Sequence, residues 1–151
     1  MFRCRFLLLG GLVLPAAVAV EPGMKAQVVG GTMASIPAKT RVRLNLTAGD
    51  ALLLQARDTE LRVDFHKVTT IEYGQNVSRR YAAAILISPV LLLSKARKHF
   101  VTLGFLDSEG KQQAVVFRVE KGDIRSLLAG LEARTGRRVE YQDDNARKSG
   151  K

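Results

Sequence analysis

Residues 41–66 read RVRLNLTAGDALLLQARDTELRVDFH, and this stretch decides the fold of the chain. Apolar and polar residues alternate at both of its ends, and this period of two is typical of a strand with one buried face. The pairs Gly49–Asp50 and Asp58–Thr59 interrupt the alternation and predict tight turns. We therefore expect three consecutive strands, which short turns join into an antiparallel meander, over 41–47, 51–57 and 60–66.

Similar patterns continue on both sides of this stretch. Further strands are expected over 26–33, 68–74, 100–107 and 114–121, with a short extended piece over 139–142. Between the segments 114–121 and 139–142, an amphipathic helix is predicted to begin after Asp123 and to end at Gly136. Its apolar face is formed by Ile124, Leu127, Leu128 and Leu131.

This order of elements predicts a mainly β (α+β) fold. We expect a small, bent antiparallel β-roll or barrel of about seven strands, which the C-terminal amphipathic helix closes at one end. Strands and helices do not alternate along the chain, so a parallel sheet is not expected. The order of elements resembles that of the pleckstrin-homology-like (PH-like) fold.

Three segments carry a more specific resemblance. They are IEYG (71–74), LLLSKARKHFVTLGF (91–105) and VVFRVEKGDIRSLLAGLEARTGRRVEY (115–141). Over residues 67–148 the chain resembles uncharacterised bacterial exported proteins that have a PH/GRAM-like domain. The resemblance implies a fold and an export route, but it implies no reaction and no catalytic residues.

The first residues, MFRCRFLLLGGLVLPAAVAVEPG, predict export. Arg3 and Arg5 precede an apolar stretch that ends in Ala17-Val18-Ala19, which is typical of a signal peptide over 1–19; an uncleaved anchor is the alternative. We expect a lead-in over 20–26, a PH-like domain over 27–142 and a flexible charged tail with nothing to bury over 143–151. The expected location is periplasmic or extracellular, with peripheral association with a membrane.

The remaining composition argues against most chemistry. Cleavage would remove Cys4, the only cysteine, and with it any disulfide or thiol nucleophile. The two histidines, His66 and His99, have no metal-site spacing, and no nucleophile or phosphate-loop motif is present. We therefore predict no catalytic residues, no metal and no cofactor. A hydrolytic enzyme is a distant third hypothesis, which would need a polar cleft that gathers Asp64, His66 and Glu72.

The chain is strongly basic, with 24 Lys and Arg against 14 Asp and Glu, or a formal net charge of +10. Such a balance favours anionic partners. The basic residues form groups at Arg41/Arg43, Arg79/Arg80, Lys95/Arg97/Lys98 and Arg134/Arg137/Arg138. Few aromatic side chains are expected to be exposed, and export removes the usual nucleic-acid targets, so we expect an anionic lipid or envelope polymer and no nucleic acid.

Residues 81–100 read YAAAILISPVLLLSKARKHF, and all but the last of them belong to an apolar and basic insertion expected over 78–99. Its apolar run, Ala82–Leu93, is too short to span a membrane, which needs about 20 residues, and it contains Pro89. Whether its side chains are exposed or belong to the core remains open. Nine residues are the candidate surface-binding set: Arg79, Arg80, Ile85, Leu86, Leu91, Lys95, Arg97, Lys98 and His99.

This order of basic, apolar and basic residues suggests a function. It favours peripheral docking on an anionic envelope or membrane surface. The alternative is a protein–protein interaction or assembly module that uses the same patch. We expect His99 to titrate near neutral pH and to add charge to this patch.

Overall fold

The computed structural model describes residues 23–33, 35–75 and 98–150 of the chain. The expected signal peptide, 1–19, lies outside these residues, and so do residues 78–97 of the expected insertion. Seven of the nine candidate surface-binding residues therefore lie outside them: Arg79, Arg80, Ile85, Leu86, Leu91, Lys95 and Arg97. Lys98 and His99 are described.

The described residues form one open sheet of eight strands with the order β4-β3-β2-β1-β7-β6-β5-β8. The strands are β1 (Met24–Gly31), β2 (Arg41–Asn45), β3 (Ala51–Gln55), β4 (Glu60–Asp64), β5 (Val68–Gly74), β6 (His99–Leu106), β7 (Gln112–Val119) and β8 (Val139–Tyr141). The helices are the 3-10 turn η1 (Phe65–Lys67), α3 (Ile124–Thr135) and α4 (Asp144–Gly150). The predicted mainly β fold with a C-terminal helix is thus confirmed, and the sheet is open rather than closed into a barrel.

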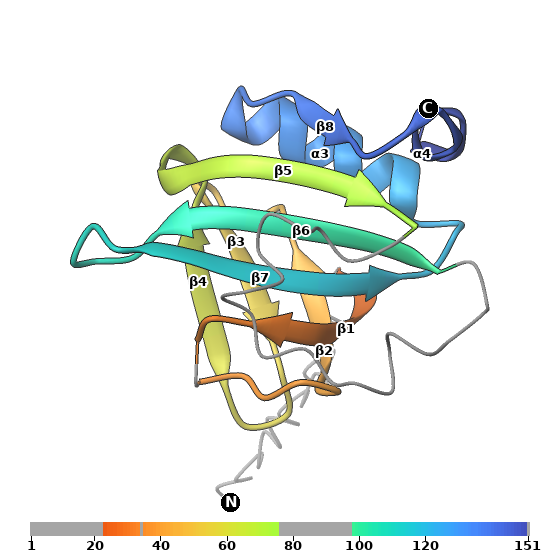
Figure 1. Cartoon of the computed structure of the whole chain (residues 1–151). Helices are drawn as coiled ribbons and strands as arrows, with labels where there is room; N and C mark the ends of the chain where they lie inside the picture. The colour runs from red at the N-terminus through yellow and green to blue at the C-terminus, as the bar shows by residue number, and fades with distance from the viewer. Residues whose placement is uncertain (1–22, 34, 76–97, 151) are drawn as a thin grey trace, which may run out of the picture.

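The strong bend of the sheet is visible in Figure 1, where β3 and β4 cross the direction of β5, β6 and β7. Strands β2 to β4 form the meander expected from residues 41–66. Strand β1 pairs antiparallel with β2 and with β7, and so joins this half of the sheet to the β5–β6–β7 half. The first strand begins at Met24, so part of the expected lead-in over 20–26 belongs to the domain.

One strand pair differs from the expected antiparallel topology. The short strand β8 runs parallel to β5, with Ile71 opposite Val139 and Tyr73 opposite Tyr141. The chain reaches this position after α3, which separates β8 from β7 and brings it to the edge of β5. The sequence contains no βαβ alternation, yet a single helix between two strands was enough to add one parallel edge strand, so the expectation of purely antiparallel pairing is wrong here.

Helix α3 covers the inner face of the sheet. The four residues expected on its apolar face, Ile124, Leu127, Leu128 and Leu131, are all buried in one core cluster with inward side chains of β5, β6 and β7. Asp123 occupies the N-cap position without a side-chain capping bond, and Gly136 ends the helix in the left-handed conformation. Near its end, Arg134 donates to the carbonyl of Gly49 and lies over the ring of Phe65, which ties α3 to the β2–β3 turn and to η1.

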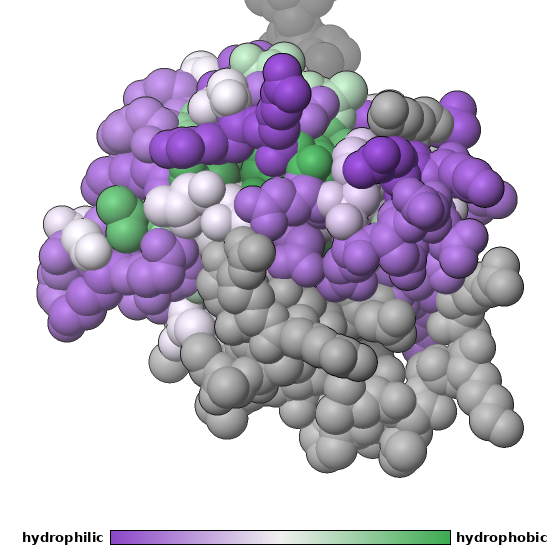
Figure 2. All heavy atoms as spheres, turned by 45° about the horizontal axis from the view of Figure 1, so that its top comes forward, coloured by the Kyte–Doolittle hydropathy of each residue, from purple (hydrophilic) through white to green (hydrophobic). Residues whose placement is uncertain are grey.

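The prediction that the C-terminal tail has nothing to bury is wrong. Residues Asp144–Gly150 form helix α4, in which Ala146 is fully buried. The backbone of Gly150 lies so close to Tyr141 that a Cβ atom there would clash with its ring, and the same atom would lie only 3.2 Å from the ring of Tyr73. Ala146 and Gly150 are four residues apart and lie on one side of the helix. Both are small residues, which carry little hydrophobic signal in a sequence. The surface on this side of the molecule is mostly hydrophilic (Figure 2).

Candidate functional site

A cleft with a volume of about 1050 Å³ lies over β3, β2, β1, β7 and the start of β6. Its described walls carry seven basic side chains: Lys25, Arg41, Arg43, Arg57, Lys98, Arg118 and Lys121. The acidic residue among them is Glu120, so the described lining has a net charge of +6 with His99 neutral, from seven positive groups and one negative group. We call this feature the basic cleft.

Strand alternation explains why the cations gather on one face. On β1 and β2, Ala26 and Val42 point into the core, so their neighbours Lys25, Arg41 and Arg43 point to the outer face. On β7, Arg118 lies between two core residues and faces outward for the same reason.

The strand register then places these side chains in rows across the sheet. Lys25 lies opposite Arg43, and Arg43 lies opposite Gln55 of β3. In the next row, Gln27 lies between Arg41 of β2 and Arg118 of β7. The cations therefore come from three strands that lie side by side.

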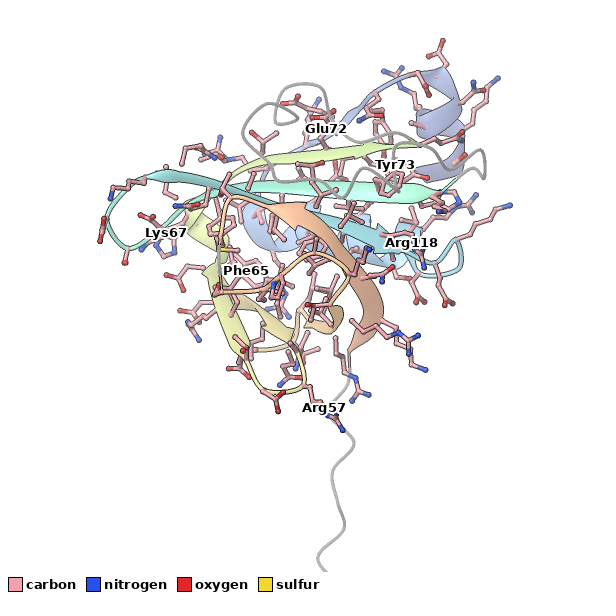
Figure 3. The ribbon with its side chains drawn as sticks, turned by 60° about the horizontal axis from the view of Figure 1, so that its bottom comes forward. Arg57, Phe65, Lys67, Glu72, Tyr73 and Arg118 are labelled. Carbon is pink, nitrogen blue, oxygen red and sulfur yellow. The ribbon has the colours of Figure 1, made fainter. Side chains whose placement is uncertain are left out.

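The ends of the basic cleft are formed by residues just outside the strands. Arg57 follows β3 by two residues, Lys98 immediately precedes β6, and Lys121 follows β7 by two residues. Figure 3 labels Arg118 on β7 and Arg57 in the turn after β3. The basic cleft thus crosses five neighbouring strands, from β3 to β6.

His99 is held in this cleft by a buried tyrosine. The hydroxyl of Tyr73, a fully buried residue of β5, lies 2.5 Å from Nδ1 of His99, and the two rings are stacked with centroids 6.0 Å apart. Burial raises the pKa of Tyr73, so this hydroxyl keeps its proton and can donate it to the neutral imidazole. The bond fixes the orientation of His99 at the rim of the cleft.

The pKa of His99 is lowered from its ordinary value of 6.5, first by burial and then by the positive charge of Lys121. At neutral pH His99 therefore remains largely neutral. His99 therefore adds charge to the cleft only at a lower pH than the near-neutral pH expected from the sequence.

This lowered pKa predicts a pH-dependent stability. Between pH 6.5 and the lower pKa of the folded state, the unfolded chain binds a proton at His99 that the folded chain does not. The free energy of unfolding that depends on neutral His99 is thus fully present above pH 6.5 and is lost as the pH falls through that interval. We expect His99→Gln to flatten the decrease in unfolding free energy below pH 6.5, as measured by denaturant titrations at several pH values. An unchanged slope in this variant would contradict the assignment.

The structure places the two described candidate residues, Lys98 and His99, in the basic cleft. Arg41 and Arg43, a basic group in the sequence, also lie there, but four other cations were missed: Lys25, Arg57, Arg118 and Lys121. Strand alternation could have placed Lys25 and Arg118 on outer faces. The sequence could not show that β1 pairs with β7, because these strands are distant in the chain.

The carboxylates considered for hydrolysis have separate partners. Asp64 is paired with Arg62 and Lys67, whereas Glu72 accepts a hydrogen bond from Gln142. His66 is exposed in η1. Over 23–33, 35–75 and 98–150, no group of three or more histidine, cysteine or acidic side chains is placed to hold a metal ion.

Comparison with known proteins assigns no family to the chain. No protein-family model matches it, and the search of curated proteins gives no match. Within the described ranges, none of the helices has the length and apolar composition needed to cross a membrane. The functional hypothesis rests on the basic cleft.

Proposed function

We propose that this chain is a non-catalytic, exported binding module that associates peripherally with an anionic surface of the cell envelope. The observation that carries the proposal is the basic cleft, whose described lining has seven cations against one carboxylate. Export rests on the signal-peptide pattern of residues 1–19. The assignment to exported proteins with a PH-like domain rests on the resemblance over residues 67–148.

The physical basis is electrostatic. Each Lys or Arg near an anionic membrane surface contributes about 1 kcal/mol of attraction. Cations that the sheet already holds on one face need little further ordering when they meet such a surface, which favours binding. The same attraction is screened by salt, so the association should be sensitive to ionic strength.

Sedimentation with vesicles tests this proposal. We expect the chain from residue 20 onward, which contains all the described elements, to sediment with phosphatidylglycerol-containing vesicles at low salt. It should stay in solution with pure phosphatidylcholine vesicles, and high salt should release it from the anionic ones. Arg118→Gln should weaken the binding about fivefold, the factor that corresponds to about 1 kcal/mol.

Arg125→Gln is the matched control, because Arg125 is exposed on α3 and does not line the basic cleft. Its vesicle binding should stay close to that of the unmodified chain. Equal sedimentation with neutral and anionic vesicles, or none with either, would reject the proposed function.

A further inference from the structure

The shape of the basic cleft says more about its ligand. We propose that the basic cleft binds an extended phosphate-bearing chain, several of whose phosphates are held at once, rather than a single phosphate or lipid headgroup. This inference rests on the proposed function, because it requires that the cleft binds anions.

The length of the basic cleft is the first argument. From Arg57 beside β3 to Lys98 beside β6 the cleft crosses five neighbouring strands. Neighbouring strands lie about 4.8 Å apart, so its length is about 19 Å. A single phosphate contacts only a small part of this length, whereas an extended chain that crosses the strands can reach both ends.

The density of charge is the second argument. The net charge of +6 is distributed over about 19 Å, or about one positive charge every 3 Å. One strand of a nucleic acid carries a phosphate about every 3.4 Å along the helix axis, which is a similar spacing. Four of the seven cations are arginines, whose planar guanidinium groups can bind phosphate oxygens through two parallel hydrogen bonds.

The side chains around the basic cleft do not favour insertion into a bilayer or stacking on bases. In the described part of the chain the exposed large hydrophobic residue is Leu106, at the opposite end of β6 from Lys98. Among the described lining residues the only ring is the imidazole of His99. The contacts would thus be made with the phosphates themselves.

Binding measurements with ligands of increasing length test the inference, using the same chain from residue 20 onward. Long-chain polyphosphate should bind at least tenfold more tightly per molecule than tripolyphosphate, and orthophosphate should bind most weakly. The logarithm of the polyphosphate affinity should fall steeply with the logarithm of salt concentration, because several counterions are released at once. Equal affinities for polyphosphate and tripolyphosphate would overturn the inference.

Two end variants make the test specific. Arg57→Gln and Lys98→Gln remove charge at the two ends of the basic cleft, so each should weaken polyphosphate binding several-fold, whereas Arg138→Gln on the surface outside it should not. If only one end matters, the ligand does not span the cleft and the inference fails. Failure of the inference alone would leave anionic-vesicle binding intact, whereas a chain that binds neither vesicles nor polyphosphate would reject the proposed function as well.

Discussion

Replacement of Leu127 by alanine is expected to lower the free energy of unfolding by about 2–5 kcal/mol, the range measured for large-to-small substitutions in protein cores. Leu127 is fully buried on the face of α3 that packs against the inner face of the sheet. The substitution removes three carbon atoms and leaves a cavity that the bent sheet can only partly fill. Since native domains are stable by about 5–15 kcal/mol, the loss is a large part of the total. Denaturant titration followed by circular dichroism measures it.

Leu106→Ala is the control for this prediction, because it makes the same chemical change at a residue that is 37% exposed at the end of β6. We expect its effect to stay within about 0.5 kcal/mol, as for most surface substitutions. If the two variants were equally stable, α3 would not be packed on the sheet as described.

The second large effect concerns binding. The triple variant Lys25→Gln, Arg41→Gln, Arg57→Gln is expected to bind anionic vesicles about 100-fold more weakly than the unmodified chain. Three cations at about 1 kcal/mol each amount to about 3 kcal/mol, and each 1.4 kcal/mol is a factor of ten. All three side chains are exposed, so the fold should tolerate their replacement. The unfolding free energy should therefore change little, by about 0.5 kcal/mol or less for each substitution.

A second triple variant separates the effect of the basic cleft from that of net charge. Arg125→Gln, Arg137→Gln, Arg138→Gln also removes three exposed positive charges, but from α3 and the residues that follow it. We expect it to retain most of the binding. A similar loss in both triple variants would show that only the net charge of the protein matters, and the basic cleft would lose its special role.

Local patterns were sufficient to predict most of the fold. The alternation of residues 41–66 and 100–121 gave strands within a few residues of the observed ones, and the apolar face of α3 was predicted residue by residue. Two parts failed for physical reasons. The parallel edge strand β8 depends on where α3 ends in space, and the burial of Ala146 in α4 depends on a close fit of small residues rather than on hydrophobicity.

The candidate site was predicted only in part. Of the nine candidate residues, the seven before Lys98 lie outside the described residues, so their role in surface binding remains a prediction. Lys98 and His99 do lie in the basic cleft, but the larger part of its charge comes from strands far away in the sequence.

The sequence by itself determined that this chain forms a basic, mainly β domain that ends with an amphipathic helix. This was possible because strand alternation, helix periodicity and net charge are properties of neighbouring residues or of the whole composition. Only the tertiary structure decided where the charge is concentrated. Lys25, Arg41, Arg57, Lys98 and Arg118 belong to strands or turns that are separated in the chain and meet only because β1 pairs with both β2 and β7. The choice of strand partners depends on the whole core, which no short stretch of sequence encodes.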